Sequence, residues 1–408
     1  MRKAIALLVY ILLSVLLIGA VFHFFTALPG VVDTTIILLI ISGLILVMSF
    51  IGLKLSDQKN TYRSILFISV CSFFFFIYDG FIGFSKNDIV LNSDGNELAA
   101  SLYLPSKKVC PCPGVVFVHG SGPMTRNEYR YFAKKFAKKG IISLIYDKRG
   151  TGVSEGYLYS GGYNSYAKDA ANVFEYLTSI ETVSAKGFIG FSEGEWVIPM
   201  AYSFLKDKPD FMVIVGASGL SPAGQVNEEI EIRLREKGFS DEEISEALDI
   251  NEAVYNFQRK GIKKDSLLSV LSKRSDQPLV TEAEDIPTNE YELGEYADYE
   301  WWRGVMDIDP KGLWEKIDPS KINLLFIKGE LDKSYAGRAE ERIRSFFSES
   351  VQSQVEFRQF KNADHMMLEW PLGERVPPPV FTDGYIKTLI EWIMCKPSAK
   401  SGLIFTLV

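Results

Sequence analysis

The chain has 408 residues, of which 47% are hydrophobic, enough for one large domain or two smaller ones with an ample core. Its formal net charge is −7 and its basic residues form no stripe, which argues against nucleic acid as a partner. Its four cysteines and three histidines do not cluster as metal ligands, so no metal or organic cofactor is expected.

The cysteines predict no disulfide framework. Cys110 and Cys112 stand in a Cys-Pro-Cys-Pro run, too close in sequence for an easy bridge, and Cys71 lies within an apolar run. A bridge from this pair to Cys395 is one alternative. Free thiols are the expected state.

The first 84 residues are far more apolar than the rest of the chain. Residues 4–25 carry no charge, residues 34–53 form a second such run, and residues 64–84 form a third that is broken only by Asp79. Each run is long enough to cross a bilayer as a helix. Residues 1–84 are therefore expected to be a transmembrane region of about three helices, with cleavage of the first as a signal peptide as the alternative.

The basic residues around these runs predict their orientation. Arg2 and Lys3 precede the first run, and Lys54, Lys59 and Arg63 lie between the second and the third. Because lysine and arginine favour the cytoplasmic side, three spans put the remainder of the chain on the extracytoplasmic face. If the third run instead lies in the membrane interface, that remainder is cytoplasmic. Asp79 is expected to be a residue at the membrane boundary.

The remainder, residues 85–408, begins with a predicted β-hairpin over residues 88–105, in which Asp94 and Gly95 form the turn. Strands and helices then alternate, and several of the strands are continuous apolar runs. This pattern predicts an α/β fold, with a mostly parallel sheet covered by helices on both faces. The strands expected after the hairpin are 114–118, 141–146, the start of 185–207, 211–215, 323–328 and 355–360; the helices are 129–139, 166–179, the end of 185–207, 338–347 and 385–394.

The segment from about residue 220 to residue 319 interrupts this alternation. It is acidic, prone to form helices and aromatic in places, notably at Tyr291, Tyr296, Tyr299, Trp301 and Trp302. It is expected to be a helical insert, which serves either as a lid over a site or as a solvated ornament.

A nucleophile is predicted where residues 190–194 read Gly-Phe-Ser-Glu-Gly, between an apolar strand and a helix. This is the G-x-S-x-G pattern in its required strand–turn–helix context, in which a sharp turn lifts the hydroxyl of Ser192 clear of the sheet. Residues 152–156 also fit the pattern, but Ser154 lies in a stretch that reads as a loop. A simple helix cap is the alternative role for Ser192.

A serine nucleophile needs a base, and histidine serves in most cases. Of the three histidines, His23 is in an apolar run and His119 is at a strand end, which leaves His365 after the last strand. Asp332 is the carboxylate best placed to orient His365, while Glu330 and Asp364 are the competing acids.

Backbone amides are expected to stabilise the oxyanion, from Glu193 after the nucleophile and from Ser121 in the loop after the first parallel strand. Further residues are expected to support the pocket and its loops: His119, Gly120, Asp147 and Arg149. Asp147 and Arg149 are expected to brace their loop as an ion pair.

Residues 88–394 resemble the α/β-hydrolase superfamily, in particular its bacterial esterase and dienelactone-hydrolase-like branch. The resemblance rests on five motifs: HGSGP at 119–123, DKRGTGVSEG at 147–156, GFSEG at 190–194, GELD at 329–332 and ADH at 363–365. It implies the fold described above and places the acid at Asp332 and the base at His365. Glu195 departs from the pattern, since a small residue commonly stands there; an acid here either disfavours anionic substrates or alters helix packing.

These features predict a membrane-anchored serine hydrolase that cleaves a carboxylic ester or thioester through an acyl-enzyme. A small-molecule or lipid-like ester is the expected substrate, because of the membrane tether. Two alternatives are a serine peptidase of the aminopeptidase or prolyl-oligopeptidase type, with acids of the insert binding the free amine, and a non-catalytic membrane protein that uses the fold to bind a partner.

Overall fold

The structure is a computed structural model that describes most of the chain. The described residues are 34–55, 59–106, 111–260, 264–287, 300–332, 338–371 and 379–396, with a few others before residue 17 and Glu292. Several features named above lie outside them: most of the first apolar run with His23, Cys110, and the insert's Tyr291, Tyr296 and Tyr299.

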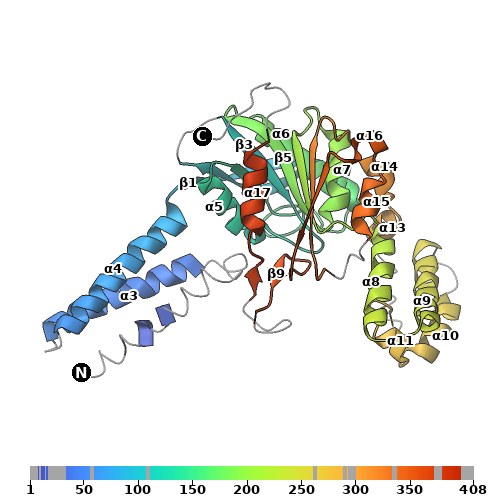
Figure 1. Cartoon of the computed structure of the whole chain (residues 1–408), viewed down its shortest axis with the longest axis horizontal. Helices are drawn as coiled ribbons and strands as arrows, with labels where there is room; N and C mark the ends of the chain where they lie inside the picture. The colour runs from blue at the N-terminus through green and yellow to red at the C-terminus, as the bar shows by residue number, and fades with distance from the viewer. Residues whose placement is uncertain are drawn as a thin grey trace.

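Two apolar helices precede the sheet. Helix α3 (Thr34–Leu55) and helix α4 (Lys59–Phe81) pack against each other through their own small core, and they extend together away from the sheet (Figure 1). Large apolar side chains such as Phe67 and Phe74 remain exposed on their outer faces. Both helices are long and apolar enough to cross a membrane, so they are candidate spans by length and composition.

Helix α4 is joined closely to the sheet. Only two residues separate its end at Phe81 from the first strand. Asp79, in the last turn of α4, accepts a hydrogen bond from Nζ of Lys138 at 2.8 Å. This expected boundary residue is thus paired with a lysine of the domain that follows.

The predicted hairpin is confirmed. Strands β1 (Phe84–Ser93) and β2 (Asn96–Pro105) pair antiparallel, with Ser93 opposite Asn96. The two turn residues have positive φ, 48° at Asp94 and 82° at Gly95. Asp and Gly tolerate this left-handed backbone, which matches the twist of the two strands.

The hairpin forms one end of an eight-stranded sheet with the order β1-β2-β4-β3-β5-β6-β7-β8. From β4 to β8 all neighbours are parallel, as the apolar strands predicted. The remaining strands of the sheet are β3 (Cys112–Val118), β4 (Ile142–Tyr146), β5 (Val183–Phe191), β6 (Phe211–Val215), β7 (Asn323–Gly329) and β8 (Val355–Phe360). Cys112 is buried in β3, and Cys395 is a free, exposed cysteine, so no bridge reaches Cys395.

Helices cover both faces of the sheet (Figure 1). Adjacent residues of β3 point to opposite faces of the sheet: Val116 belongs to the core on one face, and Phe117 belongs to the core on the other. The first core is closed by α6 (Gly162–Thr178), α7 (Gly194–Phe204), α14 (Pro310–Trp314) and α15 (Ala339–Arg344), and the second by α5 (Arg130–Lys138) and α17 (Tyr385–Met394). Short elements complete the domain: η1 (Arg126–Tyr129), α16 (Glu349–Gln352), β9 (Leu368–Glu369) and β10 (Val380–Phe381).

The segment between β6 and β7 is helical where the structure describes it. It contains α8 (Pro222–Glu236), α9 (Asp241–Lys260), α10 (Lys264–Arg274), α11 (Pro278–Thr281), α13 (Glu300–Val305) and α14. Helices α8 to α11 project from the sheet and enclose a core of their own (Figure 1). Ser221 begins α8 as its N-cap, accepting a hydrogen bond from the amide of Gly224 at 3.1 Å.

Candidate active site

Ser192 occupies a strained turn between β5 and α7. Its φ is +48°, a left-handed conformation that typically costs a non-glycine residue about 1–3 kcal/mol. Its amide donates to the carbonyl of Val215 in β6 at 2.9 Å, which fixes the turn against the next strand. A Cβ on Gly190 would lie 2.5 Å from Ile198 Cδ1, and one on Gly194 would lie 3.6 Å from the carbonyl oxygen of Val118. The glycine before the serine therefore allows the close packing that the turn needs.

Ser154, the other serine that fits the motif, is held by hydrogen bonds within the fold. Ser154 is buried in the loop after β4, where its hydroxyl donates to the carbonyl of Asp147 at 2.9 Å and accepts from the amide of Ala99 at 2.9 Å. Both bonding directions of the hydroxyl are thus in use, and they tie the loop to β2.

The structure brings Asp332 and His365 together. Asp332 follows β7, His365 follows β8, and Nδ1 of the imidazole lies 2.9 Å from Oδ2 of the carboxylate. Burial lowers the pKa of His365, but the hydrogen bond and the charge of Asp332 outweigh it and raise this pKa above its ordinary value. The bond at Nδ1 leaves Nε2 as the nitrogen that can exchange a proton with a nucleophile.

The two competing acids bind backbone and side-chain donors elsewhere. Glu330 accepts from the amide of Asn362 at 3.1 Å. Asp364 accepts from the amides of Met366 and Leu368 and from Nε1 of Trp370, each at 2.9 Å. These bonds shape the loop that carries the histidine, whereas Asp332 alone of the three is bonded to His365 within the described residues.

Two observations relate this pair to the serine turn. The parallel strands β5, β7 and β8 all end at the same edge of the sheet, so Ser192, Asp332 and His365 follow strand ends on one side. His365 is also close enough to Glu195, three residues after Ser192, to lower the pKa of that carboxyl.

The loop after β3 lies against the serine turn. A Cβ on Gly120 would lie 3.6 Å from Cβ of Ser192, so this loop passes directly beside the serine. His119 is buried and its Nε2 lies 2.6 Å from the carbonyl of Tyr146. Burial lowers the pKa of His119 to about 3, so the ring is neutral and donates to that carbonyl. His119 thereby fastens the loop to β4.

The expected ion pair between Asp147 and Arg149 is wrong. Asp147 accepts from the amides of Arg126 at 2.9 Å and Val153 at 3.1 Å, because it lies inside the turn that those amides line. Arg149 points instead to α6, where its guanidinium donates twice to Asp169, at 2.7 and 2.6 Å.

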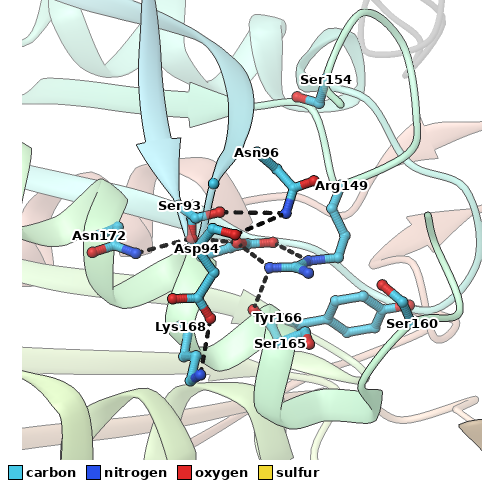
Figure 2. Close-up of polar contacts among 12 residues, drawn as sticks. Ser93, Asp94, Asn96, Arg149, Ser154, Ser160, Ser165, Tyr166, Lys168 and Asn172 are labelled. Atoms are coloured by element: carbon cyan, nitrogen blue, oxygen red, sulfur yellow. Dashed lines mark hydrogen bonds and ion pairs between the residues drawn. The ribbon is translucent and has the colours of Figure 1, made fainter. Parts of the chain in front are cut away.

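Asp169 belongs to a polar cluster that joins three elements. Figure 2 shows Ser93, Arg149 and Asn172 of this cluster. Ser93, at the end of β1, also donates to its carboxylate at 2.6 Å, and Asn172 donates to Ser93 at 2.9 Å. Burial raises the pKa of Asp169, and the bonds from Arg149 and Ser93 oppose this. Arg149 thus anchors its loop to α6 and to the hairpin.

Two buried acids close to Ser192, Glu193 and Glu195, have partners that the sequence analysis did not predict. The Glu193 carboxylate accepts from Nζ of Lys148 at 2.6 Å; burial raises its pKa, and the charge of Lys148 lowers it. The Glu195 carboxylate accepts hydrogen bonds from the amide and the hydroxyl of Ser218, in the loop after β6. In the sequence, these contacts are signalled by two acids, one on each side of Gly194, where an apolar helix begins.

Within the described ranges, no group of three or more His, Cys, Asp or Glu side chains is arranged to hold a metal ion.

The parallel sheet and the strained serine turn at its edge make this chain a member of the α/β-hydrolase superfamily. Within it, the chain belongs to the family described as "Serine aminopeptidase, S33", whose profile matches residues 110–369, well over half of the chain. No curated protein matches the sequence.

Several solved structures are similar in fold at low sequence identity. The proline iminopeptidase of Mycobacterium smegmatis is 14% identical, with a TM-score of 0.48, over 75% of this chain and 97% of its own. The esterase EaEST of Exiguobacterium antarcticum is 15% identical, with a TM-score of 0.44, over 75% and 99%. The α/β hydrolase GrgF of Penicillium sp. sh18 is 17% identical, with a TM-score of 0.46, over 77% and 99%. Likenesses this distant carry no argument about activity.

Proposed function

We propose that this chain is a membrane-anchored serine hydrolase that cleaves carboxylic ester or thioester bonds. The observation that carries the proposal is the 2.9 Å contact between His365 Nδ1 and Asp332 Oδ2, at the sheet edge that also bears the strained Ser192. A histidine whose Nδ1 is held by a buried carboxylate is prepared to accept a proton at Nε2.

In the proposed mechanism, Oγ of Ser192 attacks the ester carbonyl while Nε2 of His365 takes its proton. Asp332 holds the imidazole in one tautomer and stabilises the imidazolium that forms. The backbone amides of Ser121 and Glu193 stabilise the oxyanion. His365 then protonates the leaving group, and water attacks the acyl-enzyme by the same route in reverse.

The membrane placement is part of the proposal. Helices α3 and α4 are long and apolar enough to cross a bilayer, and they support an anchor. With the first apolar run as a third span, the basic residues that flank the spans favour the extracytoplasmic face for the catalytic domain. A site tethered at a membrane favours lipid-like or acylated esters as substrates.

A second candidate is a serine aminopeptidase, which Glu229 favours. This carboxylate is on α8, the first helix of the insert, where it accepts a hydrogen bond from Nε2 of Gln225 at 2.8 Å, and its charge contributes to the raised pKa of His365. In this candidate function Glu229 is the acid that attracts the free amine of a peptide.

Labelling with a membrane-impermeant fluorophosphonate tests the main proposal. Intact cells producing the wild type are compared with cells producing Ser192→Ala, before and after lysis. Labelling of intact cells that is lost in Ser192→Ala supports both the nucleophile and the outer placement. Labelling only after lysis supports the enzyme and contradicts the placement, and the absence of Ser192-dependent labelling in either sample contradicts the hydrolase.

Assays with two kinds of substrate distinguish the esterase from the aminopeptidase. Purified wild type and Glu229→Gln are assayed with p-nitrophenyl acyl esters and with aminoacyl p-nitroanilides. Ester cleavage that does not change in Glu229→Gln supports the esterase. Anilide cleavage whose KM rises in Glu229→Gln, because the amine loses its counter-charge, supports the aminopeptidase.

A further inference from the structure

Lys148, the second residue after β4, is buried beside the serine turn. Only 3% of it is exposed, although lysine is almost never buried without partners. Its ammonium group has three N–H donors and three acceptors in range: the carbonyls of Gly120 at 3.0 Å and Gly122 at 3.4 Å, and Oε1 of Glu193 at 2.6 Å. The ring of Tyr166 lies 4.3 Å away on another side.

The first two acceptors flank Ser121, whose amide is one proposed oxyanion donor. The carbonyl of Gly120 and the N–H of Ser121 belong to the same peptide group. In a planar trans peptide these two bonds point in opposite directions. A hydrogen bond from Lys148 to this carbonyl therefore aims the N–H of Ser121 away from the lysine and also polarises it as a donor.

The third acceptor is the side chain of Glu193, whose own amide is the second proposed donor. The carboxylate is 1% exposed and follows the nucleophile directly. Lys148 thus makes contact with both segments that carry the proposed donors, the loop after β3 and the start of α7. The two segments also lie close together directly, since a Cβ on Gly120 would be 3.6 Å from Cβ of Ser192.

We propose that Lys148 is a positioning residue that sets the oxyanion hole, by fixing the peptide of Ser121 and the side chain of Glu193 from a single ammonium group. The inference rests on the proposed serine hydrolase and deepens it. It explains why a buried lysine and a buried glutamate meet here: a neutral side chain offers fewer donors, and an ammonium left without a carboxylate is costly to bury. The alternative is an ion pair that stabilises the fold and does not act on the reaction.

The test compares three variants of the full chain, purified in detergent. Lys148→Met alone leaves a carboxylate buried without its cation, so it is paired with Glu193→Gln in a double variant, K148M/E193Q. Glu193→Gln alone is the reference, because its amide oxygen still accepts from Lys148 and the bonds to Gly120 and Gly122 remain. Lys168→Met is the matched control, since Lys168 forms an exposed ion pair with Asp94 (Figure 2). Thermal unfolding checks that each variant is folded.

Two readouts separate positioning from stability. With a p-nitrophenyl ester, we expect kcat of K148M/E193Q to fall on the order of tenfold to a hundredfold below that of Glu193→Gln, somewhat less than the loss of a donor itself, with KM within about twofold. The rate of fluorophosphonate labelling of Ser192 should fall in parallel, because the phosphoryl oxygen occupies the same hole. Lys168→Met should match the wild type in both readouts.

A folded double variant that keeps the kcat and labelling rate of Glu193→Gln overturns the inference, and so does a change confined to KM. If the double variant does not fold, Lys148→Arg replaces it: the charge opposite Glu193 stays but the donors to Gly120 move, so kcat should again fall without a change in KM. Wild type that shows no Ser192-dependent labelling contradicts the proposed hydrolase itself, and the inference with it. Wild type that is labelled, with no effect of either Lys148 variant, contradicts the inference alone.

Discussion

Replacing Glu195 by glutamine should change how the stability of the protein depends on pH. The Glu195 carboxylate is 1% exposed. It accepts three hydrogen bonds from the loop after β6: from the amide of Ser218 at 2.7 Å, from its hydroxyl at 2.7 Å, and from the amide of Gly219 at 3.1 Å. Glutamine has nearly the same shape and can accept from both amides, but it carries no charge at any pH.

The size of the effect follows from the pKa of this carboxyl. Burial raises the pKa of Glu195 from 4.5 to about 7, against the opposing bonds from Ser218 and Gly219. At ~1.4 kcal/mol for each pKa unit, the shift corresponds to about 3 kcal/mol. Because the folded state holds the proton more tightly, this contribution is fully present below pH 4.5 and is lost as the pH rises to about 7. The cost at higher pH is that of keeping an ionised carboxylate in the interior.

Unfolding of wild type and Glu195→Gln in detergent, at pH 5 and pH 8, measures this contribution. We expect the difference in unfolding free energy to move in favour of the glutamine variant by up to about 3 kcal/mol between the two pH values. Since other titrating groups are common to both proteins, they cancel in the difference. A difference that is the same at both pH values refutes the reasoning, because the carboxyl would then titrate alike in the folded and unfolded states.

Two further substitutions test the site. Asp332→Asn removes the charge that raises the pKa of His365, so the acidic limb of the kcat/KM profile should move to lower pH while kcat falls by about 10⁴-fold; an unmoved limb would exclude Asp332 as the orienting acid. Gly329→Ala would place a Cβ 2.2 Å from the carbonyl oxygen of Ala363, so the loops that carry Asp332 and His365 must separate. Melting curves should show that Gly329→Ala loses about 1–3 kcal/mol of unfolding free energy, and ester assays should show a loss of activity. Gly304→Ala, whose Cβ would meet nothing within 4 Å, should show neither loss.

The sheet could be predicted because its strands are read from local pattern. The apolar run 211–215 and the mixed segment 355–360 became β6 and β8 with the expected limits. Helix boundaries were less predictable where glycine is involved. Helix α6 begins at Gly162, four residues before the expected start. Its N-cap is Gly161, with a φ of +72°, and the glycines here are more typical of a loop than of the start of a helix. The short pair β9 and β10 has too few residues to leave a pattern.

The candidate site was predictable in part, for reasons that differ from residue to residue. With only three histidines, elimination was enough to select His365, whereas Asp332 was preferred over Glu330 and Asp364 by its place after a strand; the structure shows His365 and Asp332 in contact. The partners of Lys148 and Arg149 could not be found in this way. Each contacts an acid on a distant element, so the contact exists only once helices and sheet have packed.

The order of the strands has a consequence for how the protein can vary. Ser192 follows β5, the helical insert follows β6, and Asp332 and His365 follow β7 and β8, so the insert leaves the sheet between the proposed nucleophile and its two proposed partners. Helices α8 to α11 pack around their own core, which is separate from the two cores of the sheet. Substitutions inside this third core therefore leave the packing of the two sheet cores, and of the strands that carry Ser192, Asp332 and His365, without a direct change.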